Sequence, residues 1–470
     1  MKTHHSFRRN PGILVMLILV LYGLTFSSCR RNMLEKDALR HEQDNNKSLL
    51  SGREFTLVPD ANGRLFVDNA SNYYQPGDIL NLTGSFSGIY FSNLSGSLSD
   101  PIIIRNGSGA ATTIGNPSWN GGSWAEGLVF TNCHHIKLGG RSSQSDFVIN
   151  GSTQPARQAY FNLVLRQHTD NFEITLLTIN NGGTGIWAKT DPALTDTASW
   201  YPNTQMNNLK IHDITVNGTY NEAMYIGHTA TYWDLTNNTP KYDTLFTPGH
   251  FYVQPIKWYN VKIYNNLVTG SGADGIQTSA IDVLEIYNNE VTNWATQQNY
   301  SHNGGILIGG RTTNTNTHDN YVHDGWGEMC QFYGSGENAS THIIHNNLFR
   351  DNQAQNSGIS MRGSHNAIVQ ITNNTISKPG GVCLRINGQT GQTGAQIVNA
   401  NAFIQPRTGG GVIYPTAYIY TENGGIATEG AGTNVNTRFL TVAAANVDVN
   451  NYYLPNTGSP MGASGYRKIP

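Results

Sequence analysis

One short phrase, in which apolar and polar residues alternate before an Asn-Asn pair, recurs along the second half of this 470-residue chain. Its clearest copy is VKIYNNLV at Val261–Val268, and it returns as LEIYNNEV at Leu284–Val291 and as HIIHNNLF at His342–Phe349. The second asparagine position is filled by Asn266, Asn289, Asn320, Asn347, Asn374 and Asn401, at spacings of 23, 31, 27, 27 and 27 residues. A period of this size, built from short alternating strands, predicts a solenoid of stacked β coils.

The recurring asparagines support the same prediction, although Asn is a poor strand former. Successive coils of a β solenoid lie about 4.8 Å apart, so an Asn at the same point of each coil can donate its amide to the next one. A leucine-rich repeat is the rival fold, but it requires a Leu-rich helical half, and these segments are rich in Ile, Val, Asn, Thr and Gly. We therefore expect an all-β solenoid with an asparagine ladder.

On these residues the chain resembles the right-handed parallel β-helix family, which includes pectate lyases, chondroitinase B-like lyases and polygalacturonases. Pro76–Asn106 is similar to the first coils of such proteins, and Tyr452–Gly462 is similar to their final coil. The resemblance implies a right-handed single-stranded parallel β-helix over residues 53–470, and a polysaccharide as the partner. Subfamily signatures are missing, because only Ala273-Asp274-Gly275 and Leu384-Arg385-Ile386 match fragments of the polygalacturonase motifs.

The composition excludes some classes of partner. Charged residues make up 13% of the chain and the formal net charge is −2. A nucleic-acid-binding protein would carry basic stripes, so we expect no nucleic-acid partner. We also expect the protein to be a monomer. Cys133, Cys330 and Cys383 lie on distant coils, and no disulfide framework follows from them.

The N-terminal residues are typical of an export signal, because basic residues precede the apolar run Ile13–Phe26, which ends in Ser27-Ser28-Cys29. The alternative is a membrane anchor, but this run is shorter than the roughly 20 residues that span a bilayer. The small residues before Cys29 resemble a bacterial lipobox. The resemblance implies that Cys29 becomes a lipidated first residue, facing the periplasm or the cell exterior. Residues 30–52 are predicted to be a flexible tether.

A second phrase, usually Gly-Ile-x-x, follows each Asn phrase, as in Gly275–Thr278 and Gly305–Ile308. By alternation, the residue after the glycine points into the core and the next one points outward. The pattern predicts core positions at Ile186, Met224, Ile276, Ile306, Cys330, Ile359 and Val382. It predicts an outward column of Trp187, Tyr225, Gln277, Leu307, Gln331, Ser360 and Cys383. Tyr225 is a substrate-binding candidate in this column.

Three stretches, 189–206, 229–258 and 292–303, are longer than a minimal coil needs and are expected to bulge out as loops. We expect all three to wall the sheet formed by the Gly-Ile phrases. They are rich in aromatic residues, and Tyr232 and Trp233 are candidates for stacking on sugar rings. Packing of the loops onto the solenoid is the alternative role for these rings.

Glu222, Asp274 and Glu328 each stand directly before a Gly-Ile-type phrase. If Glu222 and Asp274 lie on adjacent coils, their backbones are about 5 Å apart, and if Asn237-Asn238 marks a hidden coil between them, about 10 Å. Grouped carboxylates are normally explained by a metal, a shared proton or a basic neighbour. We predict all three as catalytic and metal-ligating candidates, with Ca²⁺ as the ion that suits oxygen ligands on a loop edge. Capping of turn amides is the alternative role.

Basic residues follow the same strands. Arg311, Arg362 and Arg385 are expected to bind a uronate carboxylate through two hydrogen bonds. His302 is a candidate general base at the edge of the sheet. A polysaccharide lyase acting on a uronate-containing chain is therefore the first expectation. A glycoside hydrolase that uses two of the acids, and a non-catalytic glycan-binding or scaffold protein, are the alternatives.

Overall fold

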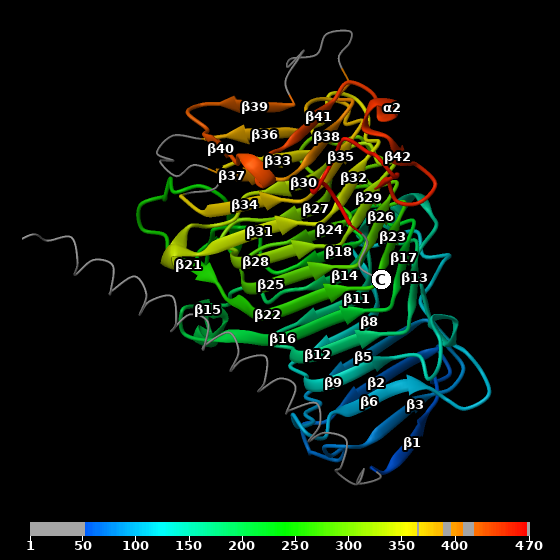
Figure 1. Cartoon of the computed structure of the whole chain (residues 1–470). Helices are drawn as coiled ribbons and strands as arrows, with labels where there is room; N and C mark the ends of the chain where they lie inside the picture. The colour runs from blue at the N-terminus through cyan, green and yellow to red at the C-terminus, as the bar shows by residue number, and fades with distance from the viewer. Residues whose placement is uncertain (1–51, 364–365, 389–395, 408–417, 468–470) are drawn as a thin grey trace, which may run out of the picture. The chain divides into compact units, whose positions relative to one another are not determined.

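The computed structural model describes residues 52–363, 366–388, 396–407 and 418–467, and residues 52–470 form one compact unit. Three long parallel sheets dominate this unit (Figure 1). Cys29 and the predicted leader lie outside the described residues. Within the described part of the chain, no helix combines the length and the apolar character needed to cross a membrane.

A complete coil contributes one strand to sheet A, one to sheet C and one to sheet B, in that order along the chain; the first coil lacks a strand in sheet C and the last lacks one in sheet B. Sheet A comprises β1 (Glu54–Leu57), β3 (Ile79–Leu82), β6 (Ile102–Asn106), β9 (His134–Gly139), β12 (Asp170–Thr175), β16 (Gln205–His212), β22 (Lys257–Tyr264), β25 (Ile281–Tyr287), β28 (Thr313–His318), β31 (Thr341–His345), β34 (Ile368–Thr372), β37 (Gln396–Asn399) and β40 (Ala427–Glu429). Sheet B comprises β2 (Arg64–Asp68), β5 (Gly88–Ser92), β8 (Ala125–Thr131), β11 (Tyr160–Arg166), β14 (Thr184–Ala188), β18 (Met224–Ile226), β24 (Ile276–Thr278), β27 (Gly304–Ile308), β30 (Glu328–Phe332), β33 (Ile359–Met361), β36 (Leu384–Asn387) and β39 (Ile419–Glu422). Sheet C comprises β4 (Ser85–Phe86), β7 (Thr112–Ile114), β10 (Phe147–Asn150), β13 (Thr178–Asn180), β17 (Thr215–Asn217), β23 (Leu267–Thr269), β26 (Glu290–Thr292), β29 (Tyr321–His323), β32 (Leu348–Arg350), β35 (Thr375–Ser377), β38 (Ala402–Ile404) and β41 (Thr437–Phe439).

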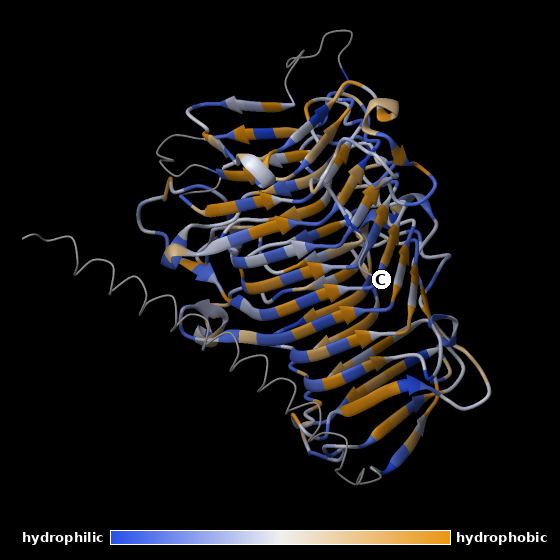
Figure 2. Cartoon of the chain, in the orientation of Figure 1, coloured by the Kyte–Doolittle hydropathy of each residue, from blue (hydrophilic) through white to orange (hydrophobic). Residues whose placement is uncertain are grey.

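The strands of each sheet pair in parallel with those of the coils before and after, which is the architecture of a parallel β-helix. The fold class predicted from the sequence is confirmed. Along the strands, hydrophobic and hydrophilic residues alternate (Figure 2), and the inward side chains stack into one continuous core. Complete burial of one such aliphatic side chain contributes about 1.5–3 kcal/mol, so a long stack of coils can fold around a narrow interior.

One predicted register is wrong, near the C-terminal end of sheet B. Ile359 pairs with Leu384 and Ser360 with Arg385, two residues further along than the Gly381-Val-Cys-Leu phrase suggested. Cys383 therefore does not join the outward column and is fully buried. Arg385 takes its place beside Ser360. The misassignment arose because the glycine pair at 380–381 imitates the start of a strand, whereas β36 begins only at Leu384.

The asparagine ladder is buried and continuous. From Asn266 onward, the side-chain amide of each ladder residue donates to the side-chain oxygen of the next at 2.9–3.0 Å. The ladder extends one coil beyond the predicted set, to Asn436. From Asn266 to Asn401, the residue before each ladder position adopts left-handed backbone geometry, as at Asn288 and Asn346. Val435, before the last ladder residue, is extended instead. Asn tolerates the left-handed conformation, which explains the Asn-Asn pair: the first residue makes the bend and the second forms the ladder.

The two longest insertions build a small antiparallel sheet of their own from β15 (Trp200–Tyr201), β19 (Tyr232–Asp234), β20 (Thr239–Lys241) and β21 (Tyr252–Pro255). Although the insertion at 229–258 separates β18 from β24 in the sequence, the two strands pair directly, so no hidden coil lies between Glu222 and Asp274.

The remaining elements are β42 (Val447–Asp448), β43 (Leu454–Pro455), α2 (Val442–Ala445) and the 3₁₀ turns η2 (Gln144–Asp146), η3 (Pro155–Ala159), η4 (Thr197–Ser199), η5 (Glu337–Ala339) and η6 (Gly432–Asn434).

Removal of one ladder side chain should destabilise the solenoid. Asn374→Ala takes away the oxygen that accepts from Asn347 and the amide that donates to Asn401. Each buried group left unsatisfied costs about 1–3 kcal/mol. We expect a lower free energy of unfolding in denaturant titrations. Asn451→Ala, at an exposed position, is the matched control, and equal stability of the two variants would contradict a supporting role for the ladder.

Candidate functional site

Three titratable side chains from consecutive coils converge at the edge of sheet B where its strands begin. Glu222 and Asp274 stand two residues before the first residues of β18 and β24, and His302 stands two residues before β27 on the next coil. One donor atom of each residue lies within 4.8 Å of the others. His302 Nδ1 is 3.7 Å from Glu222 Oε1 and 3.7 Å from Asp274 Oδ2. We call these three residues the acid cluster.

The backbone of the following coil fixes the Asp274 side chain. Asp274 Oδ1 accepts the backbone N–H of Gly304 at 2.5 Å. A β-carbon at Gly304 would lie 3.3 Å from that oxygen, so a glycine lets the two coils approach closely here. Asp274 is 0% exposed, and its Oδ2 has no hydrogen-bond partner among the described residues. A buried carboxylate oxygen without a donor is costly and points toward a proton or a ligand.

Burial and neighbouring charges shift the pKa values of Glu222 and His302, the other two residues of the acid cluster. The Glu222 side chain is only 12% exposed, and burial, followed by the charge of Asp274, raises its pKa. Interaction with Asp274 raises the pKa of His302, although partial burial opposes the change. Burial and the Asp274 carboxylate therefore shift Glu222 toward its protonated form, and Asp274 shifts His302 toward its cationic form. Neighbouring titratable groups acquire distinct acid and base roles in this way.

The outer face of sheet B next to the cluster carries aromatic rings and one amine. Trp187 and Tyr225 are register partners, and Lys189 Nζ lies 5.0 Å from the centre of the first ring and 5.1 Å from the second. Lys189 also forms an ion pair with Asp191 at 3.4 Å. Lys189 is not among the site residues predicted from the sequence. Alternation along the strand does place it on the same outer face as Trp187, two residues earlier.

Glu328, Arg362 and Arg385 do not join the acid cluster. Glu328 lies two coils beyond Asp274, about 10 Å away along the axis. Its Oε2 is 3.0 Å from Arg362 Nη2, so both charges are engaged in an ion pair. Arg385 Nε donates to Glu422 at 2.7 Å, on a coil still further along. Carboxylates of this chain therefore occupy the guanidinium groups of Arg362 and Arg385, two of the three that were expected to bind a uronate. The buried guanidinium nitrogens of Arg311 have no hydrogen-bond partner among the described residues.

The remaining candidates, Arg311, Tyr232 and Trp233, lie where the strands of sheet B end, at the opposite edge from the acid cluster. Burial lowers the pKa of Arg311 to about 10, and its guanidinium lies 5.3 Å from the Tyr201 ring. Trp233 is buried and packs edge-on against His228. The long insertions at 189–206 and 229–258 share this edge, whereas 292–303 lies beside the acid cluster. All three loops therefore flank sheet B, two at the edge where its strands end and one at the edge where they begin.

Calcium does not suit the acid cluster well. Ca²⁺ takes six to eight oxygen ligands, whereas the group of metal-ligating geometry contains two carboxylates and the imidazole of His302. Glu328, the third predicted ligand, is held by Arg362. Imidazole together with carboxylates is a donor set that favours Zn²⁺ or a similar transition metal.

No family model and no curated relative matches this sequence. Among solved structures, the GH136 lacto-N-biosidase from Eubacterium ramulus superposes with a TM-score of 0.52 at 12% identity, over 88% of this chain and 72% of that one. The complex of XylC with xylose gives 0.44 at 11% identity, over 78% and 70%. The A-module of the mannuronan C-5 epimerase AlgE4 from Azotobacter vinelandii gives 0.34 at 13%, over 82% and 91%. The likeness to the lacto-N-biosidase concerns the fold.

Titration of His302 tests the electrostatics of the cluster. Because Asp274 raises the pKa of His302, Asp274→Asn should lower it, and the imidazole should then lose its charge at a lower pH. NMR titration of the histidine ring measures this change. Glu290→Gln on sheet C, beside His323 rather than His302, is the control. An identical His302 titration in wild type and Asp274→Asn would show that the two groups do not interact in solution.

Proposed function

We propose that this protein is a glycoside hydrolase and that the acid cluster cleaves the glycosidic bond. The observation that carries the proposal is the pair of carboxylates on adjacent coils, of which Glu222 has a raised pKa caused by burial and by Asp274. Glycosidases use two carboxyl groups in this way, one protonated as general acid and the other ionised.

In the proposed reaction, Glu222 donates its proton to the oxygen of the leaving sugar as the glycosidic bond breaks. Asp274 attacks the anomeric carbon and forms a glycosyl-enzyme ester. Glu222, now ionised, then takes a proton from the water that hydrolyses this ester. Carboxyl groups about 5–5.5 Å apart are typical of such retaining enzymes, and adjacent coils bring the two acids that close. His302 covers Asp274 and is half exposed, so it has to move aside when the substrate binds.

A carbohydrate substrate agrees with the surroundings of the cluster. The rings of Trp187 and Tyr225 lie side by side on the outer face of sheet B, and aromatic faces with nearby polar groups suit sugar rings. The lacto-N-biosidase that shares the fold is itself named as a glycan-cleaving enzyme, which supports a carbohydrate substrate for this chain.

A polysaccharide lyase, the first expectation from the sequence, is the second candidate. It requires a cation to neutralise the uronate, but Arg362 and Arg385 are paired with acids, and Arg311 lies at the opposite edge of sheet B from the acid cluster. A divalent metal held by the acid cluster would supply that cation, and Asp274 Oδ2, which accepts no hydrogen bond from the described residues, favours this alternative. Lyase action leaves unsaturated, ultraviolet-absorbing ends and would stop when the metal is chelated.

A panel of neutral and uronate-containing polysaccharides, each with and without chelator, tests the proposal. The wild type should release reducing ends without ultraviolet absorbance. Glu222→Gln and Asp274→Asn should each lower kcat by at least about 100-fold, the usual contribution of a positioned acid or base. Glu290→Gln, a carboxylate substitution on sheet C, is the control. The alkaline limb of kcat/KM should follow the raised pKa of Glu222, because activity falls as Glu222 loses its proton.

Chemical rescue sharpens the assignment of Asp274. In Asp274→Ala, added azide should replace the carboxylate nucleophile and yield a glycosyl azide of inverted configuration. Unsaturated products would establish the lyase instead. If a polysaccharide binds uncut, and equally well to the wild type and Asp274→Asn, the chain is a binding protein.

We also propose that the protein is exported and anchored by a lipid on Cys29, on the strength of the leader and its Ser-Ser-Cys end. Cys29→Ser should shift the protein from the membrane fraction to the soluble fraction. Mass spectrometry of the N-terminus checks the modification, and an unlipidated terminus at another residue would contradict the proposal.

A further inference from the structure

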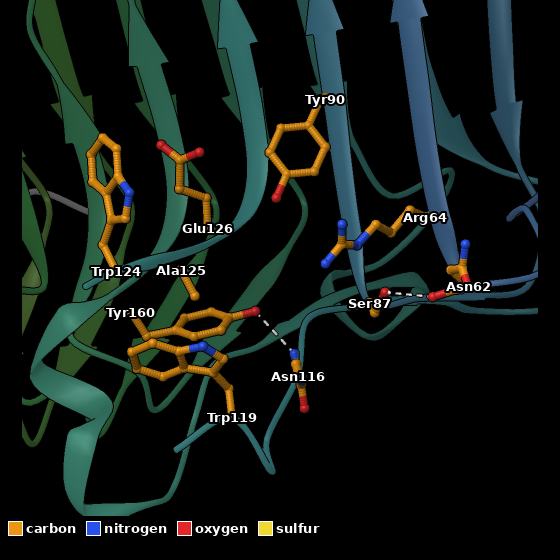
Figure 3. A pocket seen from close by; sticks show the side chains of 10 residues that line it. All are labelled: Asn62, Arg64, Ser87, Tyr90, Asn116, Trp119, Trp124, Ala125, Glu126 and Tyr160. Carbon is orange, nitrogen blue, oxygen red and sulfur yellow. Dashed lines mark hydrogen bonds between the residues drawn. The ribbon is translucent and has the colours of Figure 1, made fainter. Parts of the chain in front are cut away.

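A hollow with a volume of about 570 Å³ lies on sheet B in the first coils of the β-helix. Figure 3 shows its lining, which includes the aromatic residues Tyr90, Trp119, Trp124 and Tyr160 together with Arg64 and Glu126. We call it the N-terminal hollow. No residue in it belongs to the acid cluster, and the sequence phrases did not point to it.

The floor of the N-terminal hollow is held in place by packing and hydrogen bonds. Tyr160 is buried, and its hydroxyl accepts the backbone N–H of Asn116 at 2.9 Å. Trp119 packs edge-on against the Tyr160 ring, with centroids 5.9 Å apart. Tyr90 stacks on Phe66 of the preceding coil at 5.0 Å. These contacts fix the rings before any ligand arrives, which lowers the entropic cost of binding.

The rim of the hollow is open and carries polar groups. Trp124 stands directly before β8 and is 57% exposed, an unusual position for so large an apolar ring. Glu126 is held by Arg166 at 2.6 Å. The Arg64 guanidinium makes no hydrogen bond or ion pair within the described residues, so its donors are available to a ligand. Exposed ring faces beside free donors suit a hydroxyl-rich sugar.

The strand register aligns this hollow with the acid cluster. Glu126 and Thr184 are both register partners of Phe161. Thr184 is in turn level with Glu222, because Ile186 pairs with Met224. Glu126 and Glu222 therefore occupy the same edge of sheet B, three coils apart, which corresponds to about 14 Å along the axis. One extended chain lying along the solenoid can reach both places.

We propose that the N-terminal hollow is a second carbohydrate-binding subsite, which holds a neutral glycan chain whose other end occupies the acid cluster. Trp124 and Trp119 present ring faces to the sugars, and Arg64 donates to their hydroxyl groups. This inference rests on the proposed glycosidase function and adds that the substrate is a chain long enough to cover three coils. Short fragments bind at the acid cluster alone.

The experiment compares chain lengths. The probes are a size series of oligosaccharides prepared from a neutral polysaccharide that the wild type cleaves in the panel. Trp124→Ala should raise KM for the longest chains about tenfold, equivalent to about 1.4 kcal/mol, and leave kcat/KM for the shortest cleaved fragment unchanged. Arg64→Gln should act in the same direction. Tyr259→Ala, at an exposed ring on sheet A, is the control, and thermal melting verifies that each variant is folded.

The outcomes separate this inference from the proposed function. If the wild type cleaves glycans and Trp124→Ala and Arg64→Gln keep wild-type KM at every length, the subsite is overturned and the hydrolase stands. Equal losses on short and long chains also overturn it, because they place Trp124 at the cleavage site. If the wild type neither binds nor cleaves any polysaccharide of the panel, both proposals fall.

Discussion

The rest of this structure depends on one constraint, the stacking of coils about 4.8 Å apart along the axis of the β-helix. Backbone hydrogen bonds set that spacing in all three sheets, and the buried ladder from Asn266 to Asn436 reinforces it at one bend of each coil. Because every coil repeats the previous one, a residue type at one point of the repeat forms a row along the axis. The inward rows form the core, and the outward rows form the surface that meets a substrate.

The acid cluster follows from this constraint. The coil spacing brings together two carboxylates at the same point of adjacent coils, although their like charges repel each other. The repulsion from Asp274 adds to burial in raising the pKa of Glu222. The next coil has a glycine, Gly304, at the same point, and its N–H binds Asp274 in place of a third acid. The stable scaffold therefore bears the electrostatic cost of holding two carboxyl groups side by side, as catalytic carboxyl pairs require.

Much of the fold could be predicted because the repeat is local in sequence. The Asn-Asn phrase identified the ladder, and alternation identified most of the core. It also gave the register of most of the outward column, but the side chains of Gln277, Gln331 and Ser360 in that column are buried rather than exposed to solvent. Relations between side chains that are distant in sequence were not predictable. Nothing near Arg362 in the sequence indicates that Glu328 neutralises it, and nothing near His302 indicates that it covers Asp274. The slip at Cys383 arose because a glycine pair imitated a strand start. The N-terminal hollow was missed because its residues match no recurring phrase: Trp119 and Trp124 lie in the loop before β8, and Tyr90 lies on the coil before it.

The central claim is that adjacent coils create a glycan-cleaving centre at Glu222 and Asp274. A crystal structure of Asp274→Asn, soaked with an oligosaccharide that the wild type cleaves, tests it most directly, because this variant should bind without turnover. The account predicts a glycosidic oxygen within hydrogen-bonding distance of Glu222, an anomeric carbon facing residue 274, and His302 displaced from its present position. A sugar chain bound on sheet A or sheet C, or one that crosses sheet B without approaching Glu222, would contradict it.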